Sequence, residues 1–131
     1  MPLSRFIRLK AQSEGLHHWP EASGPERYLR FAHRHSFVVE LDLEVFHDDR
    51  EIEINAAARW LDGLIRTFAA GPQIADGPPD FGSQSCEQLA ARVADAVLDR
   101  YGRGRALRCA VLEDGVLGAG VVWQPDCESS P

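Results

Sequence analysis

The chain has 131 residues, of which 44% are hydrophobic, and its formal net charge is −6 at pH 7. This length fits one domain with a buried core, and no apolar run approaches the roughly 20 residues needed to cross a bilayer. Acidic residues are scattered among the basic ones, which argues against an electrostatic nucleic-acid interface. Because there is also no N-terminal export pattern, we expect a cytoplasmic protein that acts on small molecules or proteins.

The sequence contains three cysteines, Cys86, Cys109 and Cys127. They lie far apart and lack CxxC spacing, so they predict reduced thiols rather than disulfides or a thiolate zinc site.

The N-terminal part of the chain predicts two strands. The apolar run Phe6–Lys10 favours a first strand, and a Gly- and Pro-containing excursion follows it. From His33 to Val45 the odd positions are histidine or apolar and most even positions are polar. This period of two is typical of a half-buried strand, and residues 47–50 then predict a turn.

Two helices are predicted in the middle of the chain. Apolar residues at helical spacing predict a helix over residues 55–69, with Asn55 as its N-cap. Ser85 and Gln88 have the spacing of a capping box, which predicts a second helix over 85–101 that stops at Gly102. The Pro- and Gly-rich stretch between them, residues 71–82, predicts an ordered surface loop.

The last part of the chain predicts a hairpin. Leu107, Cys109 and Val111 alternate with polar or small residues, Asp114 and Gly115 predict a turn, and residues 120–123 form a short apolar run. The resulting order ββααββ predicts an α+β fold, a four-stranded antiparallel sheet with two helices on one face. We expect one domain over residues 1–124, a flexible tail over 125–131, and oligomerisation through the exposed sheet edges.

Histidines dominate the candidate site. His33 and His35 lie two residues apart on the predicted second strand, so both imidazoles project from one face. That face also carries Phe37, where an unpaired polar ring is costly to bury. A divalent metal, zinc first, would need a third ligand, for which His17 is our choice and His18 the substitute. The alternative is a set of solvated histidines that bond backbone groups.

Glu113 continues the inward parity of Leu107, Cys109 and Val111. A buried carboxylate needs donors, and the adjacent N–H groups of a pterin or guanine edge could supply them. The alternative is a local salt bridge or a turn acceptor. Glu53 is placed to cap the first helix. Cys86, at a helix N-terminus, is either a reactive thiol or a small buried residue.

These motifs resemble the 6-pyruvoyltetrahydropterin synthase and 6-carboxytetrahydropterin synthase family, which has the tunnelling fold. The resemblance covers a first-strand histidine, the pair His33 and His35 opening the second strand, and Glu113 near the end of the third. It also covers Ile52–Ile54 before the first helix and Ser85–Ala90 at the start of the second. It implies zinc held by His17, His33 and His35, and a homo-oligomer, trimer or hexamer. The residues implied to contact the substrate are Glu113, Glu53, Ser85 and Cys86.

The chain departs from this family at its acid–base residues. Leu29 stands about where the family has a cysteine, and residues 71–81 contain Asp76 and Asp80 but no histidine. Losing both groups would disable the family's usual proton transfers. Cys86, Glu26 and His47 are the remaining candidates for a base, although His47 lies in a turn and favours a surface role.

Three functions therefore compete. The first is a zinc-dependent, synthase- or lyase-like enzyme acting on a pterin, and the second is a non-catalytic metal-dependent binder of a pterin or purine. The third is a cupin-like metalloprotein, suggested by His33, His35 and Glu40. The opposite parity of Glu40 and the two predicted helices oppose this last possibility.

Overall fold

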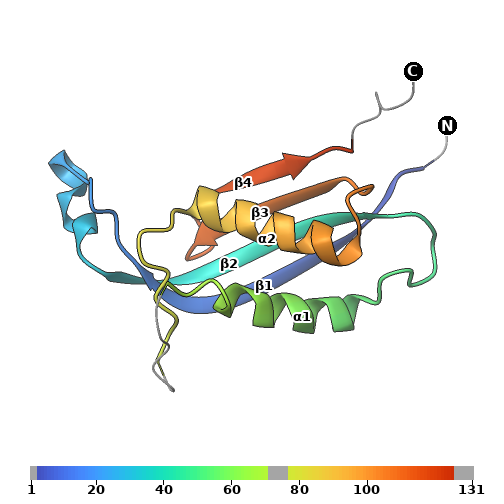
Figure 1. Cartoon of the computed structure of the whole chain (residues 1–131), viewed down its shortest axis with the longest axis horizontal. Helices are drawn as coiled ribbons and strands as arrows, with labels where there is room; N and C mark the ends of the chain where they lie inside the picture. The colour runs from blue at the N-terminus through green and yellow to red at the C-terminus, as the bar shows by residue number, and fades with distance from the viewer. Residues whose placement is uncertain (1–2, 71–76, 126–131) are drawn as a thin grey trace.

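In the part of the chain that the structure describes, the fold is a four-stranded antiparallel sheet with two α-helices, and the α+β prediction is confirmed. The computed structural model describes residues 3–70 and 77–125. The strands follow one another across the sheet in the order β1-β2-β3-β4 (Figure 1). Part of the predicted loop, residues 71–76, and the predicted tail from residue 126 lie outside the described residues.

β1 (Arg5–His17) and β2 (His33–Val45) are the longest strands, and they pair along their whole length. The bounds of β2 are as predicted, whereas β1 extends seven residues beyond the predicted run Phe6–Lys10. Its inward face continues through Ser13 and Gly15 to His17. Because these residues are polar or small, the apolar alternation fades although the strand continues, and the prediction was too short.

The excursion between β1 and β2 contains η1, a 3-10 helix (Gly24–Arg30). It lies beyond one end of the sheet (Figure 1). It is fastened by hydrogen bonds from the Trp19 amide to the Leu29 carbonyl, 2.7 Å, and from Arg30 Nε to the Ala22 carbonyl, 2.6 Å. The loop therefore holds Leu29 and Trp19 next to the ends of both strands.

The two helices begin at capping residues. The α1 helix (Ile54–Arg66) is capped by Glu53, whose carboxylate accepts hydrogen bonds from the Asn55 and Ala56 amides, so the prediction of Asn55 as N-cap was wrong. The α2 helix (Cys86–Tyr101) has the predicted capping box of Ser85 and Gln88 and ends at Gly102.

β3 (Leu107–Glu113) and β4 (Leu117–Trp123) form the predicted hairpin. Asp114 and Gly115 take positive φ angles of 56° and 71°, the conformation that short hairpin turns require and that Asp and Gly tolerate. β4 begins three residues before the predicted run 120–123, because Leu117, Gly118 and Ala119 also pair with β3.

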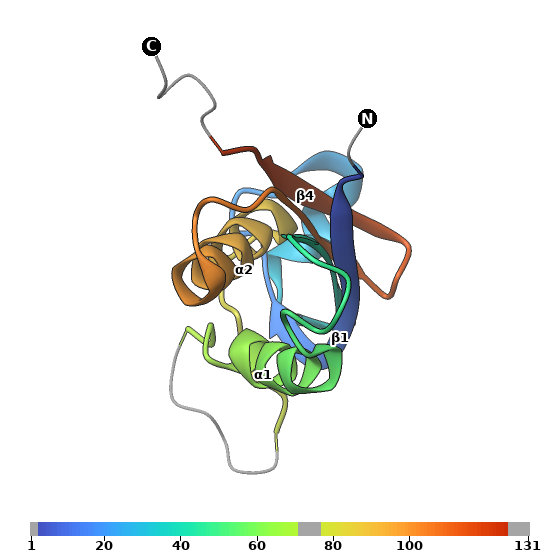
Figure 2. The ribbon, with the colours of Figure 1, turned by 90° about the vertical axis from the view of Figure 1, so that its right-hand side faces the viewer.

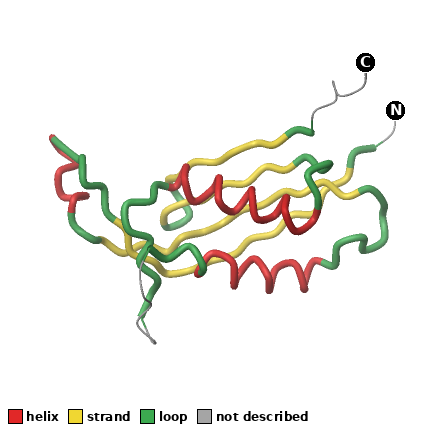
Figure 3. The backbone as a smooth tube through the Cα atoms, viewed as in Figure 1, coloured by secondary structure: helices red, strands yellow, loops and turns green. Residues whose placement is uncertain are grey.

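The core lies between the helices and the odd-numbered residues of the sheet. Apolar residues of both helices and of β1, β2 and β3 belong to one buried cluster, and Figure 2 shows both helices on the same side of the sheet. The tube view in Figure 3 shows that the helices run beside the strands. Neither helix is long and apolar enough to span a bilayer, nor is any other helix in the described part of the chain.

This architecture contradicts the cupin-like alternative. Two helices of 13 and 16 residues do not fit an all-β barrel. Glu40 lies on the sheet face opposite the histidines, where its carboxylate pairs with Lys10 at 3.2 Å. Glu40 is therefore no partner for His33 and His35.

Candidate metal centre

Three histidines converge where β1 ends and β2 begins. His17 and His33 are directly opposite each other in the strand pairing, and His35 follows two residues later on the same face. The ring centroids are 4.5 Å apart for His17 and His33, 5.3 Å for His17 and His35, and 5.0 Å for His33 and His35. One nitrogen of each ring lies within 4.8 Å of the others, so the group could hold a metal ion.

Each of the three rings has Nδ1 next to an oxygen atom. His17 Nδ1 is 3.3 Å from the Gln84 carbonyl, His33 Nδ1 is 2.9 Å from the Phe31 carbonyl, and His35 Nδ1 is 2.8 Å from the Asp114 carboxylate. A carbonyl or carboxylate oxygen accepts hydrogen bonds, so Nδ1 carries the proton in each ring. Such contacts fix the tautomer and leave the Nε2 lone pair available to a metal ion.

The Nε2 atoms of His17 and His35 are buried and have no hydrogen-bond partner. Leaving such a nitrogen unpaired costs on the order of 1–3 kcal/mol, and two together at one place fit a site that could hold a metal ion. The Glu113 carboxylate faces the same point, with Oε2 at 3.3 Å from His17 Nε2 and Oε1 at 3.4 Å from His35 Nε2.

The surroundings favour neutral imidazole at His17. Burial lowers the pKa of His17, and this outweighs the effects of the Gln84 carbonyl and the Glu113 carboxylate, which raise it. The Ser36 amide and the His35 ring donate hydrogen bonds that lower the pKa of Asp114. Neutral imidazole is the form that binds a metal, and an ionised Asp114 is the better acceptor for the His35 proton.

Phe37 forms the floor beneath the histidines. Its ring is fully buried and meets His17, His35 and Phe81 edge to face, at centroid distances of 5.1, 5.9 and 5.1 Å. Gly15 leaves room for this packing, since a Cβ atom there would lie 2.9 Å from Phe37 and 2.4 Å from Phe81. The histidines therefore stand on a packed aromatic base.

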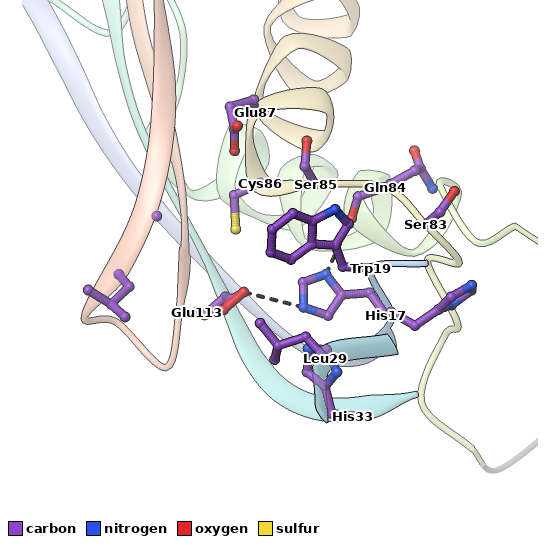
Figure 4. A pocket seen from close by; sticks show the side chains of 13 residues that line it. His17, Trp19, Leu29, His33, Ser83, Gln84, Ser85, Cys86, Glu87 and Glu113 are labelled. Carbon is purple, nitrogen blue, oxygen red and sulfur yellow. Dashed lines mark hydrogen bonds and ion pairs between the residues drawn. The ribbon is translucent and has the colours of Figure 1, made fainter. Parts of the chain in front are cut away.

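A cavity of about 460 Å³ opens beside the histidines, a size within the range of small-molecule sites. Figure 4 shows His17 and Glu113 on one side and the first residues of α2 opposite. Leu29 and Trp19 come from the excursion between β1 and β2. The lining residues include His17, His33, Glu113, Ser85, Cys86, Glu87, Leu29 and Trp19.

Three of the four predicted substrate-contacting residues line this cavity: Glu113, Ser85 and Cys86. Glu53 does not. It caps α1, which begins after the far end of β2 (Figure 1), so within the chain it lies away from the histidines, and its contact with a ligand stays a prediction. Within the chain, a short-range capping role explains that carboxylate.

Of the three candidate bases, Cys86 lines the cavity, whereas His47 and Glu26 do not. Burial raises the pKa of Cys86 to about 12, with Glu113 and Glu87 adding to the effect, so the thiol stays protonated and the reactive-thiol interpretation is not supported. His47 and Glu26 are exposed and do not line the cavity. His18, the substitute third ligand, lines the cavity but does not join the three-histidine group.

Sequence reasoning missed Asp114, the residue that contacts His35 Nδ1, and treated it only as a turn residue. No signal in the sequence indicated this contact, because it depends on the register in which Glu113 pairs with Phe37 and the next residue reaches Ser36 and His35. The carbonyls of Gln84 and Phe31 carry no signal either, since any residue type supplies a carbonyl.

Comparison with known proteins adds no relative. No protein-family model matches the sequence, and no curated protein matches it. The function must therefore be argued from the geometry of the site.

Proposed function

We propose that the chain binds a divalent metal ion, zinc first, through the Nε2 atoms of His17, His33 and His35. The observation that carries the proposal is the shared orientation of the rings: each Nδ1 lies against an oxygen, and the Nε2 atoms of His17 and His35 are buried without a partner. Three imidazoles are a common ligand set for zinc in sites that keep a further position for a substrate or water.

We further propose that the cavity beside this centre binds a pterin or a related purine-like molecule. The cavity volume suits a bicyclic ring, and Trp19 and Leu29 supply apolar surface. Glu113 offers a carboxylate that can accept two adjacent N–H groups of such a ring. The resemblance of the histidine and glutamate motifs to the pyruvoyl- and carboxytetrahydropterin synthases supports the same ligand class and a homo-oligomer.

For an enzyme of this kind, the bound metal supplies Lewis acidity that polarises a carbonyl or hydroxyl on the side chain of the substrate. Glu113 would orient the ring, and the apolar surface of Leu29 and Trp19 would limit the access of water. Asp114 would keep the His35 proton on Nδ1. The base that removes a substrate proton is not assigned to any residue.

A non-catalytic, metal-dependent binder is the second candidate, and the lining of the cavity favours it. Leu29 stands where a catalytic cysteine is expected from the resemblance, and the only thiol in the lining, Cys86, has its pKa raised to about 12. The described residues that line the cavity include no aspartate, and the histidine that Asp114 contacts, His35, is a proposed metal ligand.

Calorimetry tests the metal centre. Protein stripped with a chelator should bind zinc with a stoichiometry of one per chain, and alanine at position 17, 33 or 35 should weaken binding at least about 100-fold. His47→Ala is the matched control, because His47 is an exposed histidine outside the site, and it should bind zinc as the parent chain does. Equal binding by His33→Ala and the parent chain would refute the proposal.

A second experiment separates the two functions. Neopterin is titrated into the protein with and without zinc, and dihydroneopterin triphosphate is supplied to the zinc-loaded protein as a substrate. Zinc-dependent binding with turnover supports the enzyme, and zinc-dependent binding without turnover supports the binder. No binding of either pterin by the zinc-loaded protein would refute the ligand class.

A further inference from the structure

Glu113 faces the metal-binding atoms of the histidines themselves. Its two carboxylate oxygens lie 3.3 Å from His17 Nε2 and 3.4 Å from His35 Nε2. Neither contact is a hydrogen bond, because both nitrogens lack a hydrogen-bond partner. The Glu113 side chain is 26% exposed and the His17 side chain 10%, so little water competes for these atoms. The contact needs a different explanation.

The distribution of protons makes these contacts repulsive unless a cation lies between them. The oxygens beside Nδ1 of His17 and His35 belong to the Gln84 carbonyl and the Asp114 carboxylate, which only accept hydrogen bonds. The ring protons are therefore on Nδ1, and each Nε2 presents a lone pair. The Glu113 oxygens also present lone pairs, and lone pairs converge at low exposure only around a positive charge.

The distances agree with coordination by both residue types. Zinc binds imidazole nitrogen at about 2.0–2.1 Å and carboxylate oxygen at about 2.0–2.2 Å, so two ligand atoms of a tetrahedral site lie about 3.3–3.5 Å apart. The separations of Glu113 from His17 and from His35 are 3.3 and 3.4 Å. A hydrogen bond from an imidazole to a carboxylate is shorter, about 2.7–2.9 Å.

We infer that Glu113 is the fourth metal ligand of the protein in the absence of substrate, completing a site of three histidines and one carboxylate. This inference rests on the proposed metal centre and gives Glu113 two alternative partners. A ligand with adjacent N–H groups, or with oxygens that bind the metal, takes the carboxylate away from the ion. Ligand binding then opens a coordination position, which a site of three histidines alone would offer at all times.

Substitution with cobalt(II) tests the assignment, because its visible spectrum depends on the number and type of ligands. Glu113→Gln keeps the size of the side chain and removes its charge. Glu87→Gln is the matched control, since Glu87 lines the same cavity but is not among the residues that contact the histidines. We expect Glu113→Gln to shift the cobalt spectrum and to weaken zinc binding at least about 100-fold, while Glu87→Gln changes neither.

The outcomes distinguish this inference from the proposal beneath it. If the parent chain binds neither zinc nor cobalt, the metal centre itself is wrong. If the parent chain binds cobalt and Glu113→Gln gives the same spectrum, Glu113 is not a ligand, although the three-histidine centre stands. Weaker binding with an unchanged spectrum also overturns the inference, because it shows that Glu113 acts by its charge from outside the coordination sphere.

Discussion

The two ends of the sheet handle buried charge in opposite ways. At the end where β3 begins, Arg105 donates to the Tyr101 and Glu44 carbonyls at 2.9 and 3.1 Å and to the Glu51 carboxylate. The Glu51 carboxylate also accepts the Phe46 amide at 2.6 Å. Both Arg105 and Glu51 therefore have partners within the chain, and this end closes the fold.

The end with the histidines is nearly as enclosed, but its polar groups are not all paired within the chain. The His35 and Glu113 side chains are 19% and 26% exposed, compared with 14% for Arg105 and 18% for Glu51. Yet two histidine nitrogens there have no hydrogen-bond partner. Buried polar groups are nearly always paired. The two ends are similarly buried, but only the end with Arg105 pairs its polar groups, so we call it the structural end and the end with the histidines the binding end.

Truncation of Phe37 should give the largest loss of stability, and it tests whether the binding end depends on its aromatic base. Phe37→Ala removes the ring beneath His17 and His35, and we expect a loss of about 3–5 kcal/mol in the free energy of unfolding. Zinc binding should weaken as well, because the histidines lose their packing surface. Urea unfolding and calorimetry measure the two effects.

Leu43→Ala is the matched control for Phe37→Ala. Leu43 is fully buried on the same face of β2, toward its other end, and its truncation should cost about 2–5 kcal/mol without changing zinc affinity. If both variants lose zinc affinity equally, the binding end depends on global stability and not on its own aromatic base. Phe37→Leu is the milder variant if Phe37→Ala does not fold.

Replacement of Asp114 should have a smaller effect, which is confined to zinc affinity at the binding end. Asp114→Asn keeps a residue that tolerates the positive φ of 56°. The Ser36 amide and His35 Nδ1 donate to different carboxylate oxygens, and asparagine replaces one of these acceptors with an NH2 donor. We expect zinc affinity to fall about 10- to 100-fold with little change in the urea midpoint. Chelator competition measures the affinity.

Asp114→Gly separates the carboxylate from the turn. Glycine adopts the positive φ without strain and removes the acceptor, so it should lose as much zinc affinity as Asp114→Asn. If Asp114→Gly binds zinc as tightly as the parent chain, the contact between Asp114 and His35 does not support the metal centre.

The sequence could predict the local parts of this structure but not the parts that depend on register. His33 and His35 follow from the parity of one strand, and the capping box of α2 from a spacing of three residues. The choice of His17 over His18 was left open, because it depends on pairing β1 with β2 across a 15-residue excursion. Once His17 is known to lie opposite His33, His17 and not His18 joins His33 and His35.

Longer-range contacts and backbone groups were beyond the sequence for a different reason. Glu53 is a carboxylate of the kind expected at a ligand site, but its hydrogen bonds to the Asn55 and Ala56 amides employ it locally. Glu113 was predicted to face inward for a ligand, and its position beside two imidazole nitrogens appears only when β1, β2 and β3 are assembled. Residue type indicated which side chains could bind a ligand, and the folded structure shows which of them lie together at one site.

The smallest expected effect is a pH dependence that belongs to the structural end. The hydrogen bond from Arg105 is the largest cause that lowers the pKa of Glu51, and the hydrogen bond from the Phe46 amide lowers it further. The folded state therefore holds this proton less tightly than the unfolded chain, whose glutamate pKa is about 4.3. The stabilisation by Glu51 is fully present above that unfolded value and is lost as the pH falls through the lower folded pKa.

Comparison of Glu51→Gln with the parent chain isolates this contribution. In urea unfolding with a chelator present, the parent chain should be the more stable at pH 7, and the difference should shrink as the pH falls below about 4.3. Glu40→Gln, which breaks an exposed ion pair with Lys10, should change stability little at any pH. If the difference in the free energy of unfolding between Glu51→Gln and the parent chain stays constant from pH 7 to pH 3, the charge of Glu51 does not contribute to stability. The contrast between the two ends would then not depend on paired charges.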